Sequence, residues 1–411
     1  MTAYSPNSDQ TPAARAASVA PEGALAWAQW MIQRKTVALT GSEQAFAEQL
    51  AGLLPAKAAD IRVHPAGDGR ANLIATCHGA TPGPHIVFCG HIDTVPLGAK
   101  PWSCDPFGAE VRAGRLCGRG AADMKGGNAA MLAAFLDLAD QREFPGRLSY
   151  ALTFGEETGS EGAALMVKDG SLPRFDVMII GEPTNNRIVR RHKGALWLRV
   201  SARGRTGHGS MPQMGINAID LLTNLSAVLR DALAGLGSDP QLDRTTLCLT
   251  RLEGGVQTNV IPDFAIAEFD IRTLPGQDIE RVLGIARDLA RDLCTQQPGA
   301  GISFEVIASL PALDTPEDDL SLRAVAEACA ALGLPEVAAG GASYFTDASL
   351  LQNLGGSVVI IGPGEPSEAH QTDESLSVEA LETAVSLYRE IAIRLFTLYR
   401  PVTRSAVAAD I

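Results

Sequence analysis

The chain has 411 residues, and at roughly 150 residues per domain this length predicts two to three domains. Hydrophobic residues make up 46% and charged residues 20%, which is ordinary globular usage and excludes a disordered or coiled-coil chain. The 34 Lys and Arg residues against 47 Asp and Glu residues give a formal charge of −13, which repels nucleic-acid phosphates and anionic membrane surfaces. We therefore expect small molecules or proteins as partners, and neither nucleic acid nor a membrane.

The first twenty residues lack the apolar segment of a secretion signal, so the sequence predicts a flexible tail over residues 1–20. No stretch approaches the roughly 20 apolar residues of a membrane span. The seven cysteines are an odd number without a Cys-x-x-Cys pair, which favours a reducing, cytoplasmic location.

Short apolar runs that end in glycine alternate with stretches of helical periodicity. Such runs are typical of strands buried on both faces of a sheet. The alternation predicts an α/β fold with a mixed, mostly parallel sheet. The expected strands are 85–90, 150–155, 177–181 and 358–362, and the clearest helices are 127–139 and 377–399.

The middle of the chain has a different order of elements, which is strand, helix, strand, strand, helix, strand. This order is typical of a ferredoxin-like unit. Because sheet-like runs resume after it, we expect an inserted domain at 193–308 that interrupts a catalytic domain formed by 21–192 and 309–411. The expected elements are 195–203, 217–233, 245–252, 265–272, 279–294 and 302–307.

Polar side chains follow the apolar runs, at the sheet edge where ligands bind in open α/β folds. Each of these residues, taken alone, is of a type that is common on solvated protein surfaces. Their convergence at one edge indicates a metal site instead, because all are residue types that bind metals. A further aspartate, in a glycine-rich loop before a helix, can reach the same edge. The set is His91, Asp93, Asp123, Glu156, Glu157, Glu182 and His370.

Several carboxylates at one site repel each other unless cations neutralise them. Carboxylate and imidazole donors without thiolate favour zinc, with cobalt or manganese as substitutes. Two such ions about 3.5–4 Å apart form a hydrolytic site. The sequence therefore predicts a dinuclear metal centre that hydrolyses its substrate.

Six motifs in this order resemble the M20 metallopeptidases, in the branch of acetylornithine deacetylase and succinyl-diaminopimelate desuccinylase. The resemblance covers nearly the whole chain after the tail. The motifs are GHIDTVP at 90–96, GRGAADMKGG at 118–127, EETGS at 156–160, GEPT at 181–184, GHGS at 207–210 and AHQTD at 369–373.

The resemblance implies a role for each of the metal-binding side chains. It implies that His91 and Glu182 hold one metal, that Glu157 and His370 hold the other, and that Asp123 bridges both. It also implies a cis peptide bond after Asp123. The Asp93 carboxylate is expected to accept the second N–H of a ligating imidazole, which fixes its tautomer.

The resemblance further implies that Glu156 is the general base and acid of an amide hydrolysis carried out by a metal-bridging hydroxide. It makes His208 a donor to the oxyanion that reaches the site of a partner subunit, so a homodimer is expected. Asn259 and Arg272 resemble the substrate-contacting pair, and an arginine suits capture of a carboxylate.

One segment departs from the desuccinylase pattern. Where desuccinylases carry a Ser-Asp-Gly-Arg-like stretch, this chain has GASYFTDAS at 341–349, without the arginine. Thr346 and Asp347 are still expected to line the acyl or side-chain pocket. The departure favours acetylornithine deacetylase, or a relative acting on another N-acyl amino acid, over the desuccinylase.

The expected function is hydrolysis of the amide bond of an N-acyl amino acid. One alternative is a dipeptidase or a glutamate-releasing carboxypeptidase, because the same metal clamp hydrolyses peptide amides. Another is a noncatalytic binding protein with this fold. Glu156 argues against the latter, since binding alone requires no group that moves a proton.

Overall fold

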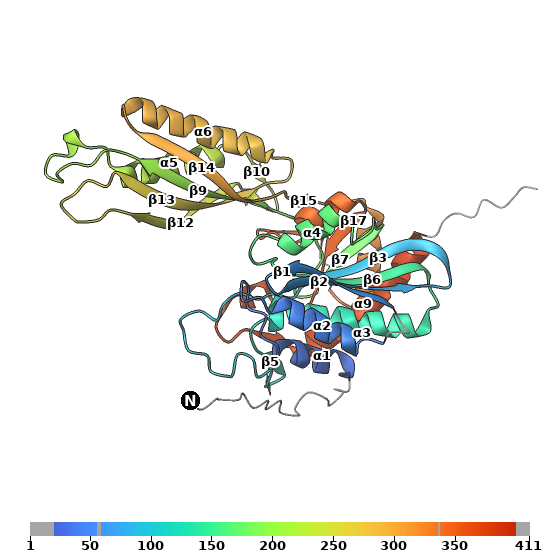
Figure 1. Cartoon of the computed structure of the whole chain (residues 1–411). Helices are drawn as coiled ribbons and strands as arrows, with labels where there is room; N and C mark the ends of the chain where they lie inside the picture. Colours follow the sequence, from blue (N-terminus) through green and yellow to red (C-terminus); the bar gives the residue numbers. More distant parts are fainter. Residues whose placement is uncertain (1–19, 56–58, 336–337, 400–411) are drawn as a thin grey trace, which may run out of the picture.

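The structure is a computed structural model that describes residues 20–55, 59–335 and 338–399. The tail predicted at 1–20 therefore lies outside the described residues, except for Ala20. Two lobes are visible, each with its own sheet (Figure 1).

The larger lobe is built on a mixed sheet whose centre is parallel. β6, β3, β7 and β17 run parallel to one another, whereas β1, β2, β8 and β15 join as antiparallel neighbours. In spatial order the strands are β1 (Asp60–Gly67), β2 (Arg70–His78), β6 (Pro145–Thr153), β3 (Thr81–His91), β7 (Val177–Ile180), β17 (Ser357–Ile360), β8 (Val189–His192) and β15 (Leu313–Asp314), with β16 (Gly340–Ala342) beside β8.

Helices cover both faces of this sheet, because its central strands are apolar on both sides. In β3, Ile86 and Phe88 pack into one hydrophobic cluster, while Val87 and Cys89 pack into another on the opposite face. The first face carries α1 (Gly23–Ile32), α2 (Glu43–Leu53), α3 (Gly126–Gln141), α7 (Leu320–Ala331) and α9 (Val378–Leu398), and the second carries α4 (Glu161–Asp169) and α8 (Ala348–Leu351).

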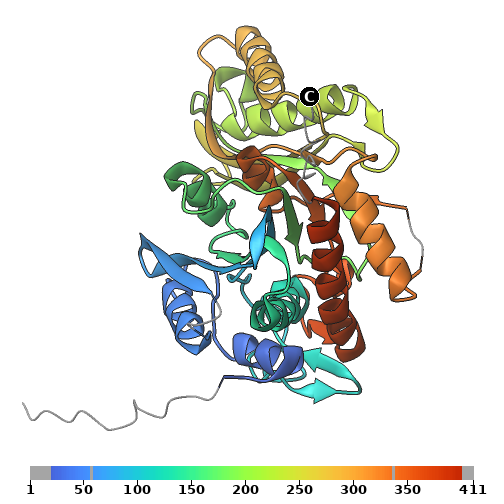
Figure 2. The ribbon, with the colours of Figure 1, turned by 90° about the vertical axis from the view of Figure 1, so that its right-hand side faces the viewer.

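The last helix shows how sequence sets an element boundary. Ser377 lies just before α9, and its hydroxyl accepts a hydrogen bond from the Ala380 backbone N–H at 3.2 Å. Serine at this position satisfies a backbone donor that has no partner within the helix. α9 then lies beside α7 along the sheet (Figure 2).

Small elements complete the two lobes and their connections. One three-stranded sheet joins the loop before α3 to the segment before α9. The elements are β4 (Val111–Arg112), β5 (Arg115–Cys117), β18 (Ser375–Ser377), the hairpin β10 (Ser238–Asp239) and β11 (Asp243–Arg244), the π-turn η1 (Ala121–Lys125), and the 3-10 turns η2 (Pro212–Met214), η3 (Gln352–Leu354) and η4 (Pro366–Glu368).

The smaller lobe is an antiparallel sheet with two helices on one face. Its order β12-β13-β9-β14 and its chain order of strand, helix, strand, strand, helix, strand are ferredoxin-like. The elements are β9 (Gly194–Arg203), α5 (Ala218–Ala234), β12 (Thr246–Gly254), β13 (Phe264–Thr273), α6 (Ile279–Gln296) and β14 (Gly301–Leu310).

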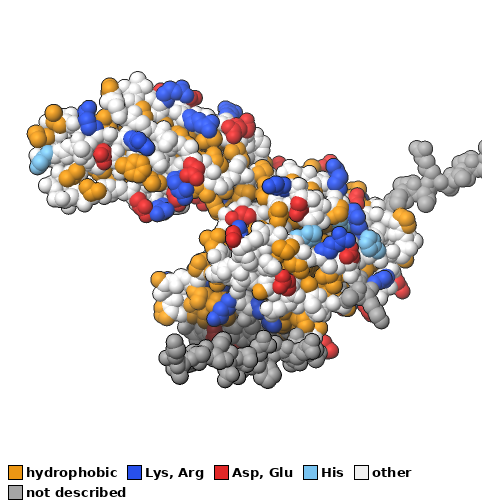
Figure 3. All heavy atoms as spheres, viewed as in Figure 1, with side chains coloured by type: hydrophobic (Ala, Val, Ile, Leu, Met, Phe, Trp, Pro, Cys, Tyr) orange, Lys and Arg blue, Asp and Glu red, His pale blue; other side chains and the backbone are white. Residues whose placement is uncertain are grey.

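Alternation along β9 separates the two faces of the smaller sheet. Leu196, Leu198 and Val200 are buried in the core under the helices, while Arg199 on the other face pairs with glutamates of the neighbouring strands. A space-filling view shows such charged side chains across this lobe (Figure 3).

The α/β fold class predicted from the sequence is confirmed, and the expected strands and helices lie within a few residues of the observed ones. The domain boundaries near 193 and 308 stay a prediction. Among the described helices, none combines the length and the apolar character that crossing a bilayer would require.

Candidate metal centre

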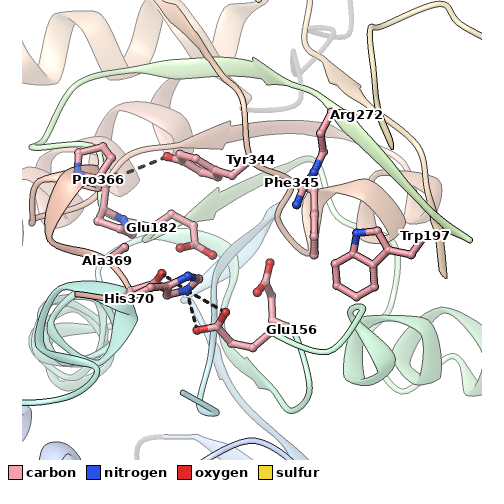
Figure 4. Close-up of a pocket in the computed structure, with 12 residues that line it drawn as sticks. Glu156, Glu182, Trp197, Arg272, Tyr344, Phe345, Pro366, Ala369 and His370 are labelled. Atoms are coloured by element: carbon pink, nitrogen blue, oxygen red, sulfur yellow. Dashed lines mark hydrogen bonds and ion pairs between the residues drawn. The ribbon is translucent and has the colours of Figure 1, made fainter. Parts of the chain in front are cut away.

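The candidate site lies where the parallel strands end. His91 is the last residue of β3, Glu156 and Glu157 follow β6, and Glu182 follows β7. His370 lies in the loop after β17, the fourth strand of the parallel group. The carboxyl ends of parallel neighbours meet at one edge, so these side chains from different strands come together, and Figure 4 shows Glu156, Glu182 and His370 of this set.

Close backbone packing brings the sixth residue to this edge. A Cβ on Gly127 would lie 2.0 Å from the Gly181 carbonyl oxygen, so only glycine lets the start of α3 approach the turn after β7 this closely. The turn η1 immediately before α3 carries Asp123, and the peptide bond between Asp123 and Met124 is cis.

Asp123 lies between two imidazoles. Its Oδ1 is 3.0 Å from His91 Nε2, and its Oδ2 is 3.4 Å from His370 Nε2. Two groups of possible ligands result, each with its donor atoms within 4.8 Å of one another, and Asp123 belongs to both. They are His91, Asp123 and Glu182, and Asp123, Glu157 and His370.

The tautomer of His91 leaves one nitrogen free to bind a cation. Its Nδ1 lies 2.9 Å from the backbone carbonyl oxygen of Asp93, which can only accept a hydrogen bond. Nδ1 therefore carries a proton, and Nε2 is the ring nitrogen that faces Asp123 and Glu182. This is the orientation that a ligating histidine requires.

Asp93 fixes this region in a different way from the one predicted. Its carboxylate oxygen is 3.7 Å from His91 Nδ1, and the backbone carbonyl takes the imidazole hydrogen bond instead. The carboxylate accepts the backbone N–H groups of Glu156 at 3.2 Å and Glu157 at 3.1 Å. Asp93 thus holds the glutamate pair, because two adjacent amides are free at the end of β6.

The charges of the cluster favour the binding of cations. Hydrogen bonds to Asp123 and Glu157 raise the pKa of the half-exposed His370 to about 10. Burial raises the pKa of Glu182 well above its usual range, and repulsion from Asp123 adds to this effect. Acids that resist ionisation and histidines that retain protons indicate excess negative charge, which divalent ions relieve. Oxygen and imidazole donors fit such ions.

Glu156 lies beside both ligand groups but belongs to neither. It is 6% exposed, and burial raises the pKa of its carboxyl well above the usual range. His91 opposes this shift, while Glu182 and Glu157 add to it. A carboxyl with a raised pKa can both take up and return a proton near neutrality.

A buried ion pair that the sequence analysis missed supports Asp123. Glu374 lies 2.7 Å from Arg119, and both side chains are 1% exposed. The Glu374 carboxylate also accepts the backbone N–H groups of Gly120, Ala122 and Asp123 at 2.8–3.0 Å. Burial raises the pKa of Glu374 to about 7 in spite of these favourable partners. No local signal marks this pair, because its members are 255 residues apart.

A cavity of about 290 Å³ adjoins the acidic cluster and reaches the smaller lobe. Its far end contains Trp197 of β9 together with Phe345 of the larger lobe, whereas the Tyr344 ring lies on the side of Glu182 and Pro366 (Figure 4). Arg272 of β13 lines the cavity, and its predicted contact with substrate stays a prediction. The sequence analysis missed the three aromatic residues. The available signal was a tryptophan on the β9 face that otherwise carries Arg199 and Ser201.

Thr346 and Asp347 do not line this cavity. They are 0% and 2% exposed, and their side chains contact His192 and Thr153 inside the larger lobe. Their predicted contact with substrate stays a prediction.

The structure also does not bring His208 and Asn259 to the cavity of their own chain. The two segments lie together, since Gly209 N–H donates to the Asn259 carbonyl at 2.8 Å and His208 pairs with Val260. The Ser210 backbone N–H donates to His208 Nδ1 at 3.2 Å. Nδ1 therefore carries no proton, and the exposed imidazole presents Nε2–H as a donor.

Comparison with known proteins identifies the class to which this fold and site belong. The sequence profile of peptidase family M20/M25/M40 matches residues 87–394. The chain therefore belongs to this family and is a hydrolase.

Among curated relatives, the chain is 31% identical to acetylornithine deacetylase of Proteus mirabilis (strain HI4320), with 85% of this chain and 89% of the relative covered. It is 27% identical to a probable succinyl-diaminopimelate desuccinylase of Staphylococcus epidermidis (strain ATCC 12228 / FDA PCI 1200), with 84% and 91% covered.

Solved structures share the fold. A tripeptidase from Staphylococcus aureus superposes with a TM-score of 0.75 at 23% identity, covering 91% of this chain and 98% of that one. An M20 family metallo-carboxypeptidase from Sulfolobus solfataricus gives 0.77 at 18% identity, covering 92% and 100%.

We expect Asp123→Ala to reduce binding at both metal positions, because its two oxygens face both histidines. Elemental analysis after loading with zinc should find well under one ion per chain. Glu156→Ala, which removes a neighbouring acid outside the ligand groups, is the control. Retention of two ions by Asp123→Ala would contradict a bridging position.

We expect Glu374→Gln to lower both thermal stability and metal affinity. Breaking a buried ion pair costs about 3–5 kcal/mol, and the backbone before Asp123 loses one of the two carboxylate oxygens that accept its N–H groups. The matched control is Glu368→Gln, which removes the partner of a partly exposed arginine at 3.1 Å and should cost about 0–1 kcal/mol. Thermal unfolding and zinc titration measure both effects. Equal behaviour of the two variants would contradict this role for Glu374.

Proposed function

We propose that this chain is a dinuclear metal-dependent amidohydrolase that removes the acyl group from an N-acyl amino acid. The observation that carries the proposal is Asp123 between His91 and His370, beside the buried carboxyl of Glu156. The similarity to an acetylornithine deacetylase supports the same reaction type.

The two ligand groups would hold the ions. His91 and Glu182 would bind one, Glu157 and His370 the other, and Asp123 both. Zinc fits these donors best, with cobalt or manganese as substitutes. Two such ions supply Lewis acidity, which polarises an amide carbonyl and lowers the pKa of water.

Glu156 would move the proton. Its backbone N–H is fixed by Asp93, and its side chain lines the cavity between the ligand groups and the aromatic residues. The carboxylate takes a proton from the attacking water. As the carbon–nitrogen bond breaks, the same oxygen returns this proton to the leaving nitrogen, so the amine departs neutral.

Arg272 would bind the carboxylate of the amino acid. Its Nε and one terminal nitrogen donate to Asp270 at 2.7 and 2.8 Å, whereas Nη1 is buried without a hydrogen-bond partner among the described residues. A substrate carboxylate would satisfy this remaining donor, which is costly to leave unpaired.

A second copy of the chain would complete the site. His208 and Asn259 are on one end of the smaller lobe and face no part of their own cavity. We propose a homodimer in which His208 Nε2–H of the second copy donates to the carbonyl oxygen as negative charge develops there. A cytoplasmic location is part of the same proposal.

We expect Glu156→Ala to bind metal normally and to lose turnover by about 10²–10⁴-fold, the usual contribution of a general base. Elemental analysis and hydrolysis of N-acetyl amino acids by the same zinc-loaded preparation measure the two quantities. Turnover within a few-fold of the original chain would show that another group moves the proton.

We expect mixed subunits of two impaired variants to regain activity. Glu156→Ala and His208→Ala each lack a different part of the site. A dimer of one subunit of each has one site with an intact Glu156 and an intact His208 from its neighbour. Random exchange should therefore restore about a quarter of the original activity. Each variant taken alone through the same exchange is the control, and a mixture no more active than the controls would place His208 outside the partner's site.

A further inference from the structure

The cavity has two ends of different chemistry. One end is the acidic cluster, and the other is an aromatic wall formed by Trp197 and Phe345. Their ring centroids are 5.7 Å apart at an interplanar angle of 72°, a favourable edge-to-face arrangement. In the close-up view Glu182 and His370 lie on one side, the wall lies on the other, and Glu156 lies between them (Figure 4). A substrate that reaches both ends must therefore carry an apolar group.

The chain's own lining offers one free cationic side chain for a substrate carboxylate. Among the described residues that line the cavity, the cationic types are Arg272 and His370. His370 faces Glu157 at 3.0 Å and Asp123 at 3.4 Å, so it belongs to the acidic cluster. A substrate with a second or third carboxylate would leave that charge without a partner, beside glutamates that repel it.

The acids that line the cavity are those of the candidate metal centre and Glu156, and the proposed reaction already uses all of them. Asp270, the carboxylate nearest to Arg272, is already bound to it through both oxygens. An ammonium group at the aromatic end would lose its hydration without gaining a counter-ion. The substrate side chain is therefore uncharged.

The position of Arg272 decides which part of the substrate meets the aromatic wall. Its guanidinium carbon is 5.2 Å from the centre of the Phe345 ring. The carboxylate and the side chain of an amino acid leave the same Cα. A carboxylate at Arg272 thus brings the side chain, rather than the acyl group, next to Phe345 and Trp197.

We propose that the substrates are N-acyl amino acids with one carboxylate and an apolar side chain, aromatic or long aliphatic, which packs on Trp197 and Phe345. This inference rests on the proposed deacylase function. It predicts that N-acetyl-L-phenylalanine and N-acetyl-L-methionine are better substrates than N-acetyl-L-ornithine or N-succinyl-L,L-diaminopimelate.

The test compares kcat/KM of the zinc-loaded chain for these four compounds, for N-acetylglycine and for dipeptides. We expect N-acetyl-L-phenylalanine to exceed both N-acetylglycine and N-acetyl-L-ornithine by about 10–100-fold, the usual gain from burying one large apolar side chain. Binding of the products provides a readout without catalysis. L-Phenylalanine should bind more tightly than L-ornithine by at least about tenfold in calorimetry.

Substitutions of Trp197 test whether this residue causes the preference for an apolar side chain. Trp197→Ala should lower the ratio of kcat/KM for N-acetyl-L-phenylalanine over N-acetylglycine by about 10-fold or more, and Trp197→Phe should restore most of it. The matched control is Phe264→Ala, which removes an aromatic residue that is 46% exposed on the same sheet and outside the cavity. This control should leave the ratio unchanged.

The outcomes separate the two proposals. Preference for N-acetyl-L-ornithine or the succinyl compound, or a ratio that Trp197→Ala does not move, would overturn the apolar pocket while leaving the deacylase intact. Hydrolysis of dipeptides but of no N-acyl amino acid would overturn the proposed function itself. In that case, equal binding of L-phenylalanine and L-ornithine would overturn the apolar pocket as well.

Discussion

The Asp123 carboxylate lies between the Nε2 atoms of His91 and His370, and the rest of the larger lobe serves to hold it there. The neighbouring Glu157 and Glu182 add negative charge that two imidazoles do not balance. Such a cluster is tolerated only where the fold enforces it and cations relieve it. The glycine contact at the start of α3, the Asp93 hydrogen bonds and the Glu374–Arg119 pair supply this enforcement.

The gathering of the candidate ligands at one edge of the sheet could be predicted from the sequence because two simple rules apply to it. Parallel strands that are apolar on both faces are easy to recognise, and the residues that follow them must meet at one edge. His91, Glu157 and Glu182 obey both rules directly. The ferredoxin-like order was equally visible, since helices and strands there have clean periodicities of 3.6 and 2.

Other features could not be predicted, because they depend on which of several possible partners a side chain contacts when distant segments come together. The carboxylate of Asp93 was expected at His91, but the free amides after β6 take it and leave the imidazole to a backbone carbonyl. Glu374 and Arg119 are 255 residues apart, and only the tertiary fold brings them together. Likewise, nothing local shows that Thr346 turns inward while its neighbour Phe345 faces the cavity.

The cavity draws its aromatic residues from both lobes. Phe345 belongs to the larger lobe, whereas Trp197 and Arg272 are on adjacent strands of the smaller sheet. Under the proposed function, the relative position of the lobes would set how closely a substrate side chain is held, whereas the carboxylates of the candidate metal centre all belong to the larger lobe. A rotation about the connecting segments would move Arg272 and Trp197 relative to those carboxylates, so substitutions in these segments, far from the centre, would alter both substrate discrimination and the rate.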